Sequence, residues 1–322
     1  MYKLAIIGAT GLVGKTVLNI LEEKNLPIYE YVLFSSSRSA GSIIHFKNKD
    51  YTVRELKENS FLDEHFDFAI FSAGGETSKK FAPIAATNDC IVIDNSNAFR
   101  MNETVPLVVP EVNPEDIKLN KGIIANPNCS TIQAMLPIKA LDDKYTVKRI
   151  IYSTYQAVSG AGRLGIEDLK NNSLNKFPYP INNNCLPHID NFLDNGYTKE
   201  EEKMINETRK ILHKPDLKIT ATCVRVPVLN CHSESINLEF EKEFDIKDIN
   251  LTLSNFENIT IIDNPKENLY PLPANISGKD NVFVGRIRRD YSVKNGLNIW
   301  VVADNIRKGA ATNAIQILEK LL

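Results

Sequence analysis

Short apolar runs alternate with a helix-like pattern in the first half of the chain. The run Leu4–Gly8 precedes Leu12–Glu23, where apolar residues recur with the spacing of an amphipathic helix. Further apolar runs that end at turn residues predict strands at Tyr31–Phe34, Phe68–Ser72, Ile91–Asp94, Leu107–Val109 and Ile123–Ala125. The segment Ser42–Val53 predicts a small inserted hairpin. This alternation is typical of a parallel sheet with crossover helices.

After Leu136 the pattern changes to longer strands in which polar and apolar positions alternate. These strands are predicted at Arg149–Ala157, Lys218–Val228, Ser233–Glu241, Val282–Arg288 and Leu297–Ala303. Alternation of this kind is typical of half-buried antiparallel strands. The polar passage Asn171–Pro187 predicts a loop, and Glu200–Leu212 predicts a helix. A final helix is expected over Ile306–Leu321, with Asn305 as its N-cap.

A glycine-rich segment, Gly8-Ala-Thr-Gly11-Leu-Val-Gly14, joins the first strand to the first helix. Glycines there permit a tight turn and close backbone approach to a pyrophosphate at the helix N-terminus. A structural turn without a ligand is the alternative. The second strand ends in hydroxyl residues and Arg38, where an NAD site usually carries an acid. A 2′-phosphate suits this chemistry, so we predict NADP.

The chain is therefore expected to have an α/β fold with two domains. A Rossmann-type, doubly wound dinucleotide-binding domain is predicted over residues 1–127, with the C-terminal helix 305–322 returning to it. Residues 128–304 are expected to form an α+β domain with a mainly antiparallel sheet. A chain of 322 residues accommodates both, since domains typically span about 100–200 residues.

Composition excludes several classes of protein. The 38 Lys and Arg residues against 40 Asp and Glu residues give a net charge of −2, which does not favour nucleic-acid binding. No apolar run approaches the roughly 20 residues of a membrane span, and no secretory signal is recognised. The five Cys residues are an odd number and widely spaced, which favours a reducing cytoplasm over a disulfide framework.

A single Cys follows the apolar strand Ile123–Ala125 and begins a predicted helix, in the order Asn126-Pro-Asn-Cys129-Ser-Thr. The first amides and the dipole of a helix stabilise an anion. A thiol placed there ionises more readily than a free thiol, whose pKa is about 8.5. We predict that Cys129 is a nucleophile, and the alternative is a buried, inert thiol.

The second half contributes Arg225 and His232, which are seven residues apart and flank an irregular passage between two strands. His is a natural proton shuttle near neutral pH, and Arg suits bidentate recognition of a carboxylate. Taken alone, a satisfied structural His is the more common case. A zinc site built from Cys223, Cys231 and His232 is rejected, because their spacing matches no metal-binding pattern.

With these pieces together, the chain resembles the aspartate-semialdehyde dehydrogenase family from end to end. The resemblance rests on GATGLVG, SSSRSAG, FSAGGETS, IDNSNAFRM, PLVVPEVN, NPNCST, STYQAVSGAG, ETRKIL, CVRVPVLNCHSES, FVGRIRRD and WVVADN with KGAA. No single segment is specific, whereas the set is.

The resemblance implies roles for the matching residues. Cys129 matches the acyl-thioester nucleophile, His232 the acid/base, and Gln156 the residue that orients the substrate beside the thiol. Arg225 matches the group that binds the substrate carboxylate, and Glu200 the acid that meets its amino group. The phosphate-binding pair corresponds to Arg100 and Lys203. The implied cofactor contacts are Gly8, Thr10, Gly11, Leu12, Val13, Arg38, Ser39, Ser159, Gly160 and Asn305.

The implied reaction is reduction of β-aspartyl phosphate by NADPH to aspartate semialdehyde and phosphate, in lysine, threonine and methionine biosynthesis. It needs no metal, nucleic acid or membrane, and the implied assembly is a cytoplasmic homodimer or a dimer of such dimers. A thioester accepts hydride well because sulfur donates weakly into the carbonyl, which explains the need for a thiol.

Two departures from the family pattern and two competing functions stay open. The passage 165–187 is shorter than in many relatives, which affects the expected subunit interface, and Thr312 stands where relatives often have Trp. N-acetyl-γ-glutamyl-phosphate reductase shares the architecture, although Glu200 argues against it. A non-catalytic NADP-binding regulator would tolerate loss of Cys129 or His232, and both are present.

Overall fold

A computed structural model describes residues 1–322, and the chain divides into two compact units. Unit 1 consists of Met1–Asn128 with Ala310–Leu322, and unit 2 of Cys129–Gly309. The elements of unit 1 are β1 (Tyr2–Ile7), α1 (Leu12–Glu23), β2 (Ile28–Ser35), β3 (Ile43–Phe46), β4 (Lys49–Thr52), β5 (Arg54–Glu55), η1 (Glu58–Phe61), β6 (Phe68–Phe71), α2 (Gly75–Thr87), β7 (Ile91–Asp94), η2 (Pro114–Leu119), β8 (Ile123–Ala125) and α8 (Asn313–Leu321).

Unit 2 begins with a long helix and ends near the π-helical segment η5 (Arg307–Thr312), which leads back into unit 1. That first helix is α3 (Cys129–Tyr145). The elements that follow it are β9 (Val147–Gln156), η3 (Val158–Ala161), α4 (Gly162–Asn171), α5 (Lys199–Ile211), β10 (Lys218–Arg225), β11 (His232–Phe240), α6 (Ile246–Ser254), β12 (Ile259–Ile261), η4 (Pro265–Glu267), α7 (Pro273–Ile276), β13 (Val282–Asp290) and β14 (Gly296–Ala303).

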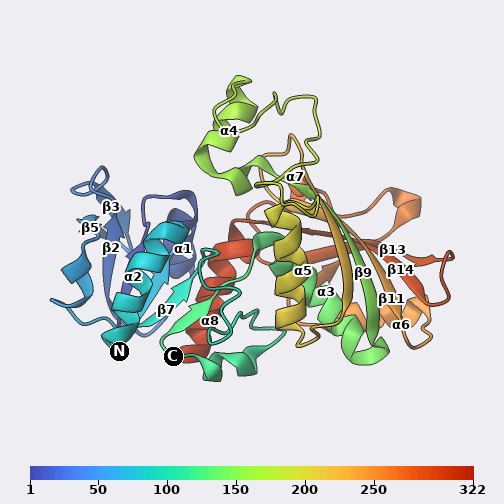
Figure 1. The fold of residues 1–322 in the computed structure, drawn as a ribbon, viewed down its shortest axis with the longest axis horizontal. Coiled ribbons are helices and arrows are strands. Elements are labelled where there is room, and N and C mark those ends of the chain that lie inside the picture. The colour runs from blue at the N-terminus through green and yellow to red at the C-terminus, as the bar shows by residue number, and fades with distance from the viewer. The chain divides into compact units, whose positions relative to one another are not determined.

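The central sheet of unit 1 is parallel throughout, in the order β5-β2-β1-β6-β7-β8 (Figure 1). Its middle strands are apolar on both faces, as helix-covered parallel strands must be, and Leu4–Ile7 of β1 are all buried. Ile315 and Leu318 of α8 join the same core, so the C-terminal helix belongs to this unit. The predicted hairpin is confirmed as the antiparallel pair β3–β4.

The expected strand Leu107–Val109 does not form. Leu107 makes only an isolated bridge to Ala125. Pro106 and Pro110 flank this segment and neither has a backbone N–H to donate, so the pairing cannot extend in either direction.

The sheet of unit 2 is mixed, in the order β10-β9-β11-β14-β13-β12. The three central pairs, β9–β11, β11–β14 and β14–β13, are antiparallel, whereas β10–β9 and β12–β13 are parallel. Helices α3, α5 and α6 pack on one face of this sheet (Figure 1). The predicted α/β fold with a mainly antiparallel second sheet is therefore confirmed.

The last predicted helix is shorter than expected. Asn305 does not cap it; its Oδ1 accepts a hydrogen bond from the backbone of Cys231, and its Nδ2 donates to the Ser159 hydroxyl. Asp304 instead accepts from the backbone N–H groups of Ile306 and Arg307. The chain then forms η5 before α8, and residues 305–309 cluster with unit 2.

The passage after α4 is held by one carboxylate. Asp168 is fully buried and accepts hydrogen bonds from the backbone N–H groups of Asn175, Lys176 and Phe177. This brings the Phe177 side chain into a small apolar cluster with Val158. The short loop is therefore an ordered part of unit 2. No helix of the structure has both the length and the apolar character needed to cross a membrane.

Candidate functional site

The glycine-rich turn of unit 1 is closed tightly against its neighbours. Gly8 has φ +84°, which glycine adopts without strain, and a Cβ there would lie 2.9 Å from the carbonyl carbon of Ser72. A Cβ on Gly14 would lie 2.2 Å from the carbonyl oxygen of Gly8. Only glycine fits at these two positions, so the backbone can approach a ligand phosphate at the start of α1.

A pocket of about 510 Å³ opens beside this turn within unit 1. Its lining includes four predicted cofactor contacts, Gly8, Thr10, Gly11 and Arg38, together with Ser35, Leu56 and Phe81. The Thr10 and Ser35 hydroxyls lie 2.8 Å apart and tie the turn to the end of β2. Arg38 is exposed and supplies the positive charge of this lining. A glycine cradle beside an Arg and no carboxylate fits a dinucleotide with a 2′-phosphate.

Three further predicted cofactor contacts of unit 1 do not line this pocket. Leu12 and Val13 are the first residues of α1, and Ser39 follows β2 in a turn where its N–H donates to the Ser36 carbonyl.

Arg100 is buried in unit 1, close to the carboxyl ends of β7 and β8. Its Nε donates to the carbonyl of Asn126 at 2.9 Å, and its Nη2 donates to the carbonyl of Asn95 at 2.9 Å. These bonds fix the guanidinium against Asn126, which precedes Cys129 by three residues in the chain. Ligands of open α/β sheets bind at this end of the strands.

In unit 2, Cys129 is the first residue of α3, as the sequence predicted. Its Sγ lies 3.2 Å from Nε2 of His232, the first residue of β11. A Cβ on Gly309 would lie 2.9 Å from Cβ of Cys129, so that glycine leaves room for the nucleophile. The fold thus brings together the two residues expected to form the reacting pair, which are 103 positions apart.

His232 is fully buried, and its ring is oriented from behind. The backbone N–H of Ala157 donates to Nδ1 at 2.9 Å, so Nδ1 is an acceptor and carries no proton. The neutral ring therefore bears its hydrogen on Nε2, facing the sulfur of Cys129. Burial is the main reason that the pKa of His232 is lowered to about 3. The nearby charge of Arg225 also lowers this pKa, and Glu200 acts to raise it.

Arg225 lies at the end of β10, beside His232. Its Nη1 donates to the carbonyl of Ala157 at 2.6 Å, and its guanidinium lies over the ring of Phe177, 6.0 Å from the centroid. Burial lowers the pKa of Arg225, while Glu200 acts to raise it. An Arg remains charged under these conditions, so this is a buried cation with donors left for a ligand.

Gln156 ends β9 in register with Arg225 and is held by two neighbours. Its Oε1 accepts from the hydroxyl of Thr154 at 2.9 Å, and its Nε2 donates to Oε1 of Glu200 at 3.0 Å. Glu200 lies in the first turn of α5, which a capping box between Thr198 and Glu201 begins. The site is therefore built from the last residues of β9 and β10, the first residue of β11, and the first turns of α3 and α5.

Lys203 contacts two carboxylates, Glu200 at 3.1 Å and Asp190 at 2.8 Å. Burial acts to lower the pKa of Lys203, but Glu200 and Asp190 outweigh it and raise the pKa, so the ammonium stays charged. Arg100 belongs to unit 1 and Lys203 to unit 2. Each candidate for phosphate binding is thus a charged group held by its own unit.

The remaining predicted contacts, Ser159, Gly160 and Asn305, gather in unit 2. The side chains of Ser159 and Asn305 are buried and bonded to each other. A Cβ on Gly160 would lie 3.0 Å from Nη1 of Arg225 and 3.0 Å from Cε1 of His232. Glycine at position 160 therefore keeps the space beside Arg225 and His232 open.

The sequence did not indicate Ala157, Gln133 or Asp190, because main-chain contacts and neighbours on distant elements carry no local signal. The structure also contains no cluster of three or more His, Cys, Asp or Glu residues arranged to hold a metal. All five Cys are free thiols. Burial raises the pKa of Cys90 and of Cys231 to about 12, which separates these two from a nucleophile.

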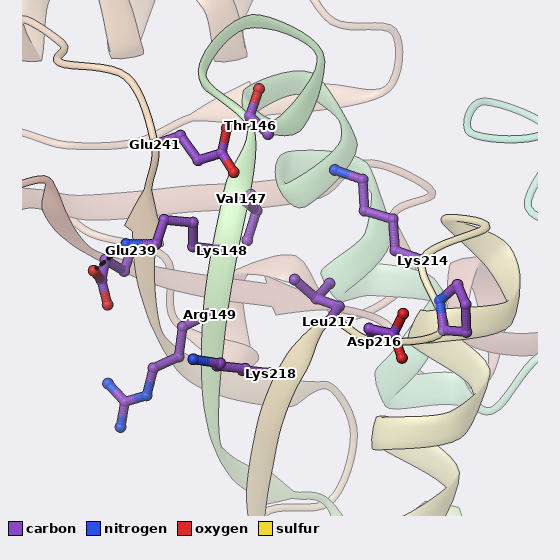
Figure 2. Close-up of a pocket in the computed structure, with 11 residues that line it drawn as sticks. Thr146, Val147, Lys148, Arg149, Lys214, Asp216, Leu217, Lys218, Glu239 and Glu241 are labelled. Carbon is purple, nitrogen blue, oxygen red and sulfur yellow. Dashed lines mark hydrogen bonds and ion pairs between the residues drawn. The ribbon is translucent and has the colours of Figure 1, made fainter.

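A second cavity, of about 550 Å³, lies at the other end of β9 (Figure 2). Two of its lining cations are paired: Lys148 with Glu239 at 3.0 Å, and Lys214 with Asp142, which lies outside the lining. Gln156 is seven residues from Arg149 along β9, about 23 Å at strand spacing. This cavity is remote from the Cys129 site.

Comparison with known protein families defines the class of protein. Residues 3–120 match the family model described as "Semialdehyde dehydrogenase, NAD binding domain". Residues 138–308 match the model described as "Semialdehyde dehydrogenase, dimerisation domain". The chain thus carries the two domains of a semialdehyde dehydrogenase, one matched within each unit.

Full-length relatives narrow the assignment. An aspartate-semialdehyde dehydrogenase of Aquifex aeolicus is 56% identical over 335 aligned positions, covering 100% of this chain and 98% of the relative. The crystal structure of aspartate semialdehyde dehydrogenase II complexed with ASA from Vibrio cholerae has a TM-score of 0.96 at 45% identity, covering 100% and 98% of the two chains. That of the Candida albicans enzyme with NADP has a TM-score of 0.80 at 26% identity, covering 100% and 98%.

The chain belongs to the aspartate-semialdehyde dehydrogenase family, an enzyme family of oxidoreductases. The resemblance inferred from its sequence segments is confirmed.

Proposed function

We propose that this protein reduces β-aspartyl phosphate with NADPH to aspartate semialdehyde and phosphate, in lysine, threonine and methionine biosynthesis. The observation that carries the proposal is the 3.2 Å contact between Sγ of Cys129 and Nε2 of His232, beside the buried guanidinium of Arg225. The names of the relatives support the substrate, and the Candida albicans complex supports NADP.

Cys129 opens the reaction. Its thiolate attacks the acyl carbon, the bond to the phosphate oxygen breaks with its electron pair going to phosphate, and a thioester forms on Sγ. When bound, NADPH supplies a hydride to this carbonyl. The resulting thiohemiacetal anion expels the Cys129 thiolate and releases the aldehyde. The Nε2–H of His232 stabilises by hydrogen bonding first the thiolate and then the developing oxyanion.

The substrate is held by its polar ends. Arg225 offers the paired donors that a carboxylate accepts in bidentate fashion. Glu200 supplies a carboxylate for the substrate amino group, and Gln156, hydrogen-bonded to Glu200, orients the acyl group beside Cys129. N-acetyl-γ-glutamyl-phosphate has no free ammonium for Glu200, which is the argument against that alternative substrate.

Phosphate recognition is assigned to Arg100 and Lys203. Arg supplies a planar fork of donors, and Lys supplies a compact charge. Lys203 is bound to Glu200 and Asp190, so an anion would compete with these carboxylates for the ammonium.

We assign unit 1 as the NADP-binding domain and unit 2 as the catalytic and dimerisation domain. Thr10 and Gly11 would hold the pyrophosphate, and Arg38 the 2′-phosphate. Gly8, Leu12, Val13 and Ser39 would shape that site, and Ser159, Gly160 and Asn305 are proposed as further cofactor contacts.

The face of the unit 2 sheet opposite α3 and α5 supports a homodimer. On β9, side chains that point away from the helices are half-buried or exposed, and Tyr155 is 38% exposed beside Trp300. A half-exposed sheet face with aromatic residues is suited to pairing with a second copy. A dimer of dimers would need a second surface. Free thiols throughout the chain support a cytoplasmic location.

The proposal is tested by following NADP reduction with aspartate semialdehyde, with and without phosphate. Turnover that requires phosphate is the expected result. Comparable turnover with the semialdehyde of N-acetylglutamate would favour the alternative reductase. Cofactor binding without turnover on either substrate would favour the non-catalytic regulator.

A further inference from the structure

Glu234 is a fully buried carboxyl group, two residues after His232 on β11. Side chains alternate along a strand, so His232 and Glu234 point to the same face, which α3 contacts. Neither carboxyl oxygen of Glu234 has a partner in good hydrogen-bond geometry, although the Gln133 amide is near enough to act on its pKa. Buried polar atoms are nearly always paired, so this carboxyl group requires an explanation.

The charges around Glu234 disfavour its ionised form. Burial raises the pKa of Tyr152 on β9 and of Cys223 on β10, and a negative charge on Glu234 adds to both effects. Glu200 and Glu201 of α5 also act on Cys223, so carboxylates predominate in this region. Burial raises the pKa of Glu234 itself well above its usual value, against an opposing effect of the Gln133 amide. Burial and the surrounding carboxylates therefore favour the protonated form of Glu234.

Gln133 connects this acid to the reacting pair. It lies four residues, about one helical turn, after Cys129 on α3. Its Nε2 donates to the backbone carbonyl of His232 at 3.3 Å. Its Oε1 is buried and has no hydrogen-bond partner in the structure. A neutral Glu234 has one O–H to donate, and the Gln133 oxygen is an acceptor within its neighbourhood.

We propose that Glu234 acts as a protonated positioning residue, which donates its O–H to Oε1 of Gln133 and thereby fixes α3 against β11. The terminal torsion of Glu234 is broad and soft, so its O–H can turn toward Oε1 of Gln133 while the Gln133 amide keeps its bond to the carbonyl of His232. Cys129 and Gln133 lie on one face of α3, and His232 and Glu234 lie on one face of β11. The link at Gln133 and Glu234 therefore holds the sulfur of Cys129 against Nε2 of His232. This inference rests on the proposed roles of Cys129 and His232.

The protonated form is essential to this arrangement. An ionised Glu234 could only accept hydrogen bonds and would repel the carbonyl oxygen of Gln133. Its negative charge would also oppose a thiolate on Cys129. A Gln at position 234 carries an amide N–H and no charge, so it reproduces the donor, whereas a Leu keeps the volume and removes the donor.

Four variants of the full-length protein test the proposal: Glu234→Gln, Glu234→Leu, Gln133→Leu and, as a matched control, Tyr152→Phe. The control also removes a buried hydrogen bond from this sheet face, but that bond joins β9 to Thr208 of α5. The readouts are kcat and KM, the rate at which iodoacetamide alkylates Cys129, located by peptide mass spectrometry, and the thermal midpoint as a function of pH.

Both Leu variants are expected to lower kcat about tenfold or more through misplacement of the sulfur, with KM values within roughly twofold of the unaltered protein. Their alkylation of Cys129 should slow several-fold. Glu234→Gln and Tyr152→Phe should keep both rates. The Glu234→Gln protein should also melt at a higher temperature than the unaltered protein at pH 8. The difference should disappear below about pH 4.5, because only the unfolded Glu234 loses its proton above that pH.

The proposal is overturned if Glu234→Gln is as slow as Glu234→Leu, if both Leu variants keep their kcat and alkylation rate, or if the melting difference does not depend on pH. Failure of the proposed function gives a different result. The unaltered protein would then lack phosphate-dependent turnover, while the alkylation rates still separate the Leu variants from Glu234→Gln.

Discussion

At the scale of single residues, the main chain of Ala157 orients two side chains of the site. Its N–H donates to Nδ1 of His232, and its carbonyl accepts from Arg225. The imidazole and the guanidinium are therefore placed by one residue, at the point where β9 ends. Both bonds are made by main-chain atoms of a buried residue, so the residue type at position 157 does not reveal them in the sequence.

The geometry of Arg225 leads to a prediction about substrate affinity. A Lys cannot offer two parallel donors to a carboxylate, nor can it donate to Ala157 and the substrate with the same geometry. Arg225→Lys should raise KM for aspartate semialdehyde by about tenfold or more and lower kcat through misplacement of the carbonyl. Steady-state kinetics at saturating NADP and phosphate measure both. An unchanged KM would place the carboxylate site elsewhere.

Cofactor choice is predicted from Arg38. Its exposed guanidinium is the positive group in the pocket beside the glycine turn. The unaltered protein should have a higher kcat/KM with NADP than with NAD, and Arg38→Ala should weaken NADP specifically and so narrow the ratio. Arg54, exposed on β5 but paired with Glu64, is a matched control whose change to Ala should leave the ratio unaltered. Equal use of both cofactors by the unaltered protein would refute this assignment.

At the scale of elements, the periodicity of the sequence identified most strands and helices correctly. Helix α1 and strands β7 and β8 have the predicted bounds. The two errors have different causes. Pro106 and Pro110, which the sequence shows, prevent the strand at Leu107–Val109. Asn305 is engaged by Ser159 and Cys231 rather than by the last helix, and these contacts join distant parts of the chain that no pattern within a segment could predict.

The start of α5 carries the prediction for phosphate binding. Its first turn places Glu200 and Lys203 together, and Asp190 binds the same ammonium. Lys203→Leu and Arg100→Leu should each raise KM for phosphate several-fold, because each removes one charge-assisted contact. KM for NADP should stay near its original value in both. Lys199, an exposed residue of the same helix, serves as the control when changed to Leu.

If KM for phosphate is unaffected in the Lys203 and Arg100 variants, both cations are structural and the anion binds elsewhere. If KM for phosphate rises in only one of the two variants, only that residue binds the phosphate.

At the scale of the whole molecule, burial of neutral His232 links stability to pH. The folded protein keeps this ring unprotonated down to a pKa of about 3, whereas the unfolded chain takes up a proton below about pH 6.5. The unfolding free energy should therefore decrease as the pH falls from about 6.5 toward 3, by up to about 1.4 kcal/mol per pH unit for this proton.

Urea unfolding of the unaltered protein and of His232→Asn between pH 4 and 7 measures this contribution. The unfolding free energy of His232→Asn should depend less on pH than that of the unaltered protein, by the contribution of the proton on His232. The exposed His65, changed to Asn, is the control and should leave the slope unaltered. Equal slopes for the unaltered protein and His232→Asn would mean that the ring is protonated in the folded state.

The assembled site shows what a sequence can and cannot predict at this scale. The residue types and the resemblance indicated Cys129, His232, Gln156 and Arg225, and the structure brings these four together in unit 2. Composition and spacing gave no information about Gln133 and Glu234, because their significance depends on the packing of α3 against β11. Buried polar support becomes visible only when the neighbours of each atom are known.

The central claim, that Cys129 carries the acyl group, is tested most directly by trapping the intermediate. Incubation with aspartate semialdehyde and NADP in the absence of phosphate should stop the reaction at the thioester. Peptide mass spectrometry should then find the acyl group on Cys129. It should be absent from Cys129→Ala, which binds NADP but does not turn over, and present in Cys185→Ala, which lacks an exposed thiol. An acyl group on another residue, or turnover by Cys129→Ala comparable to the unaltered protein, would contradict this account.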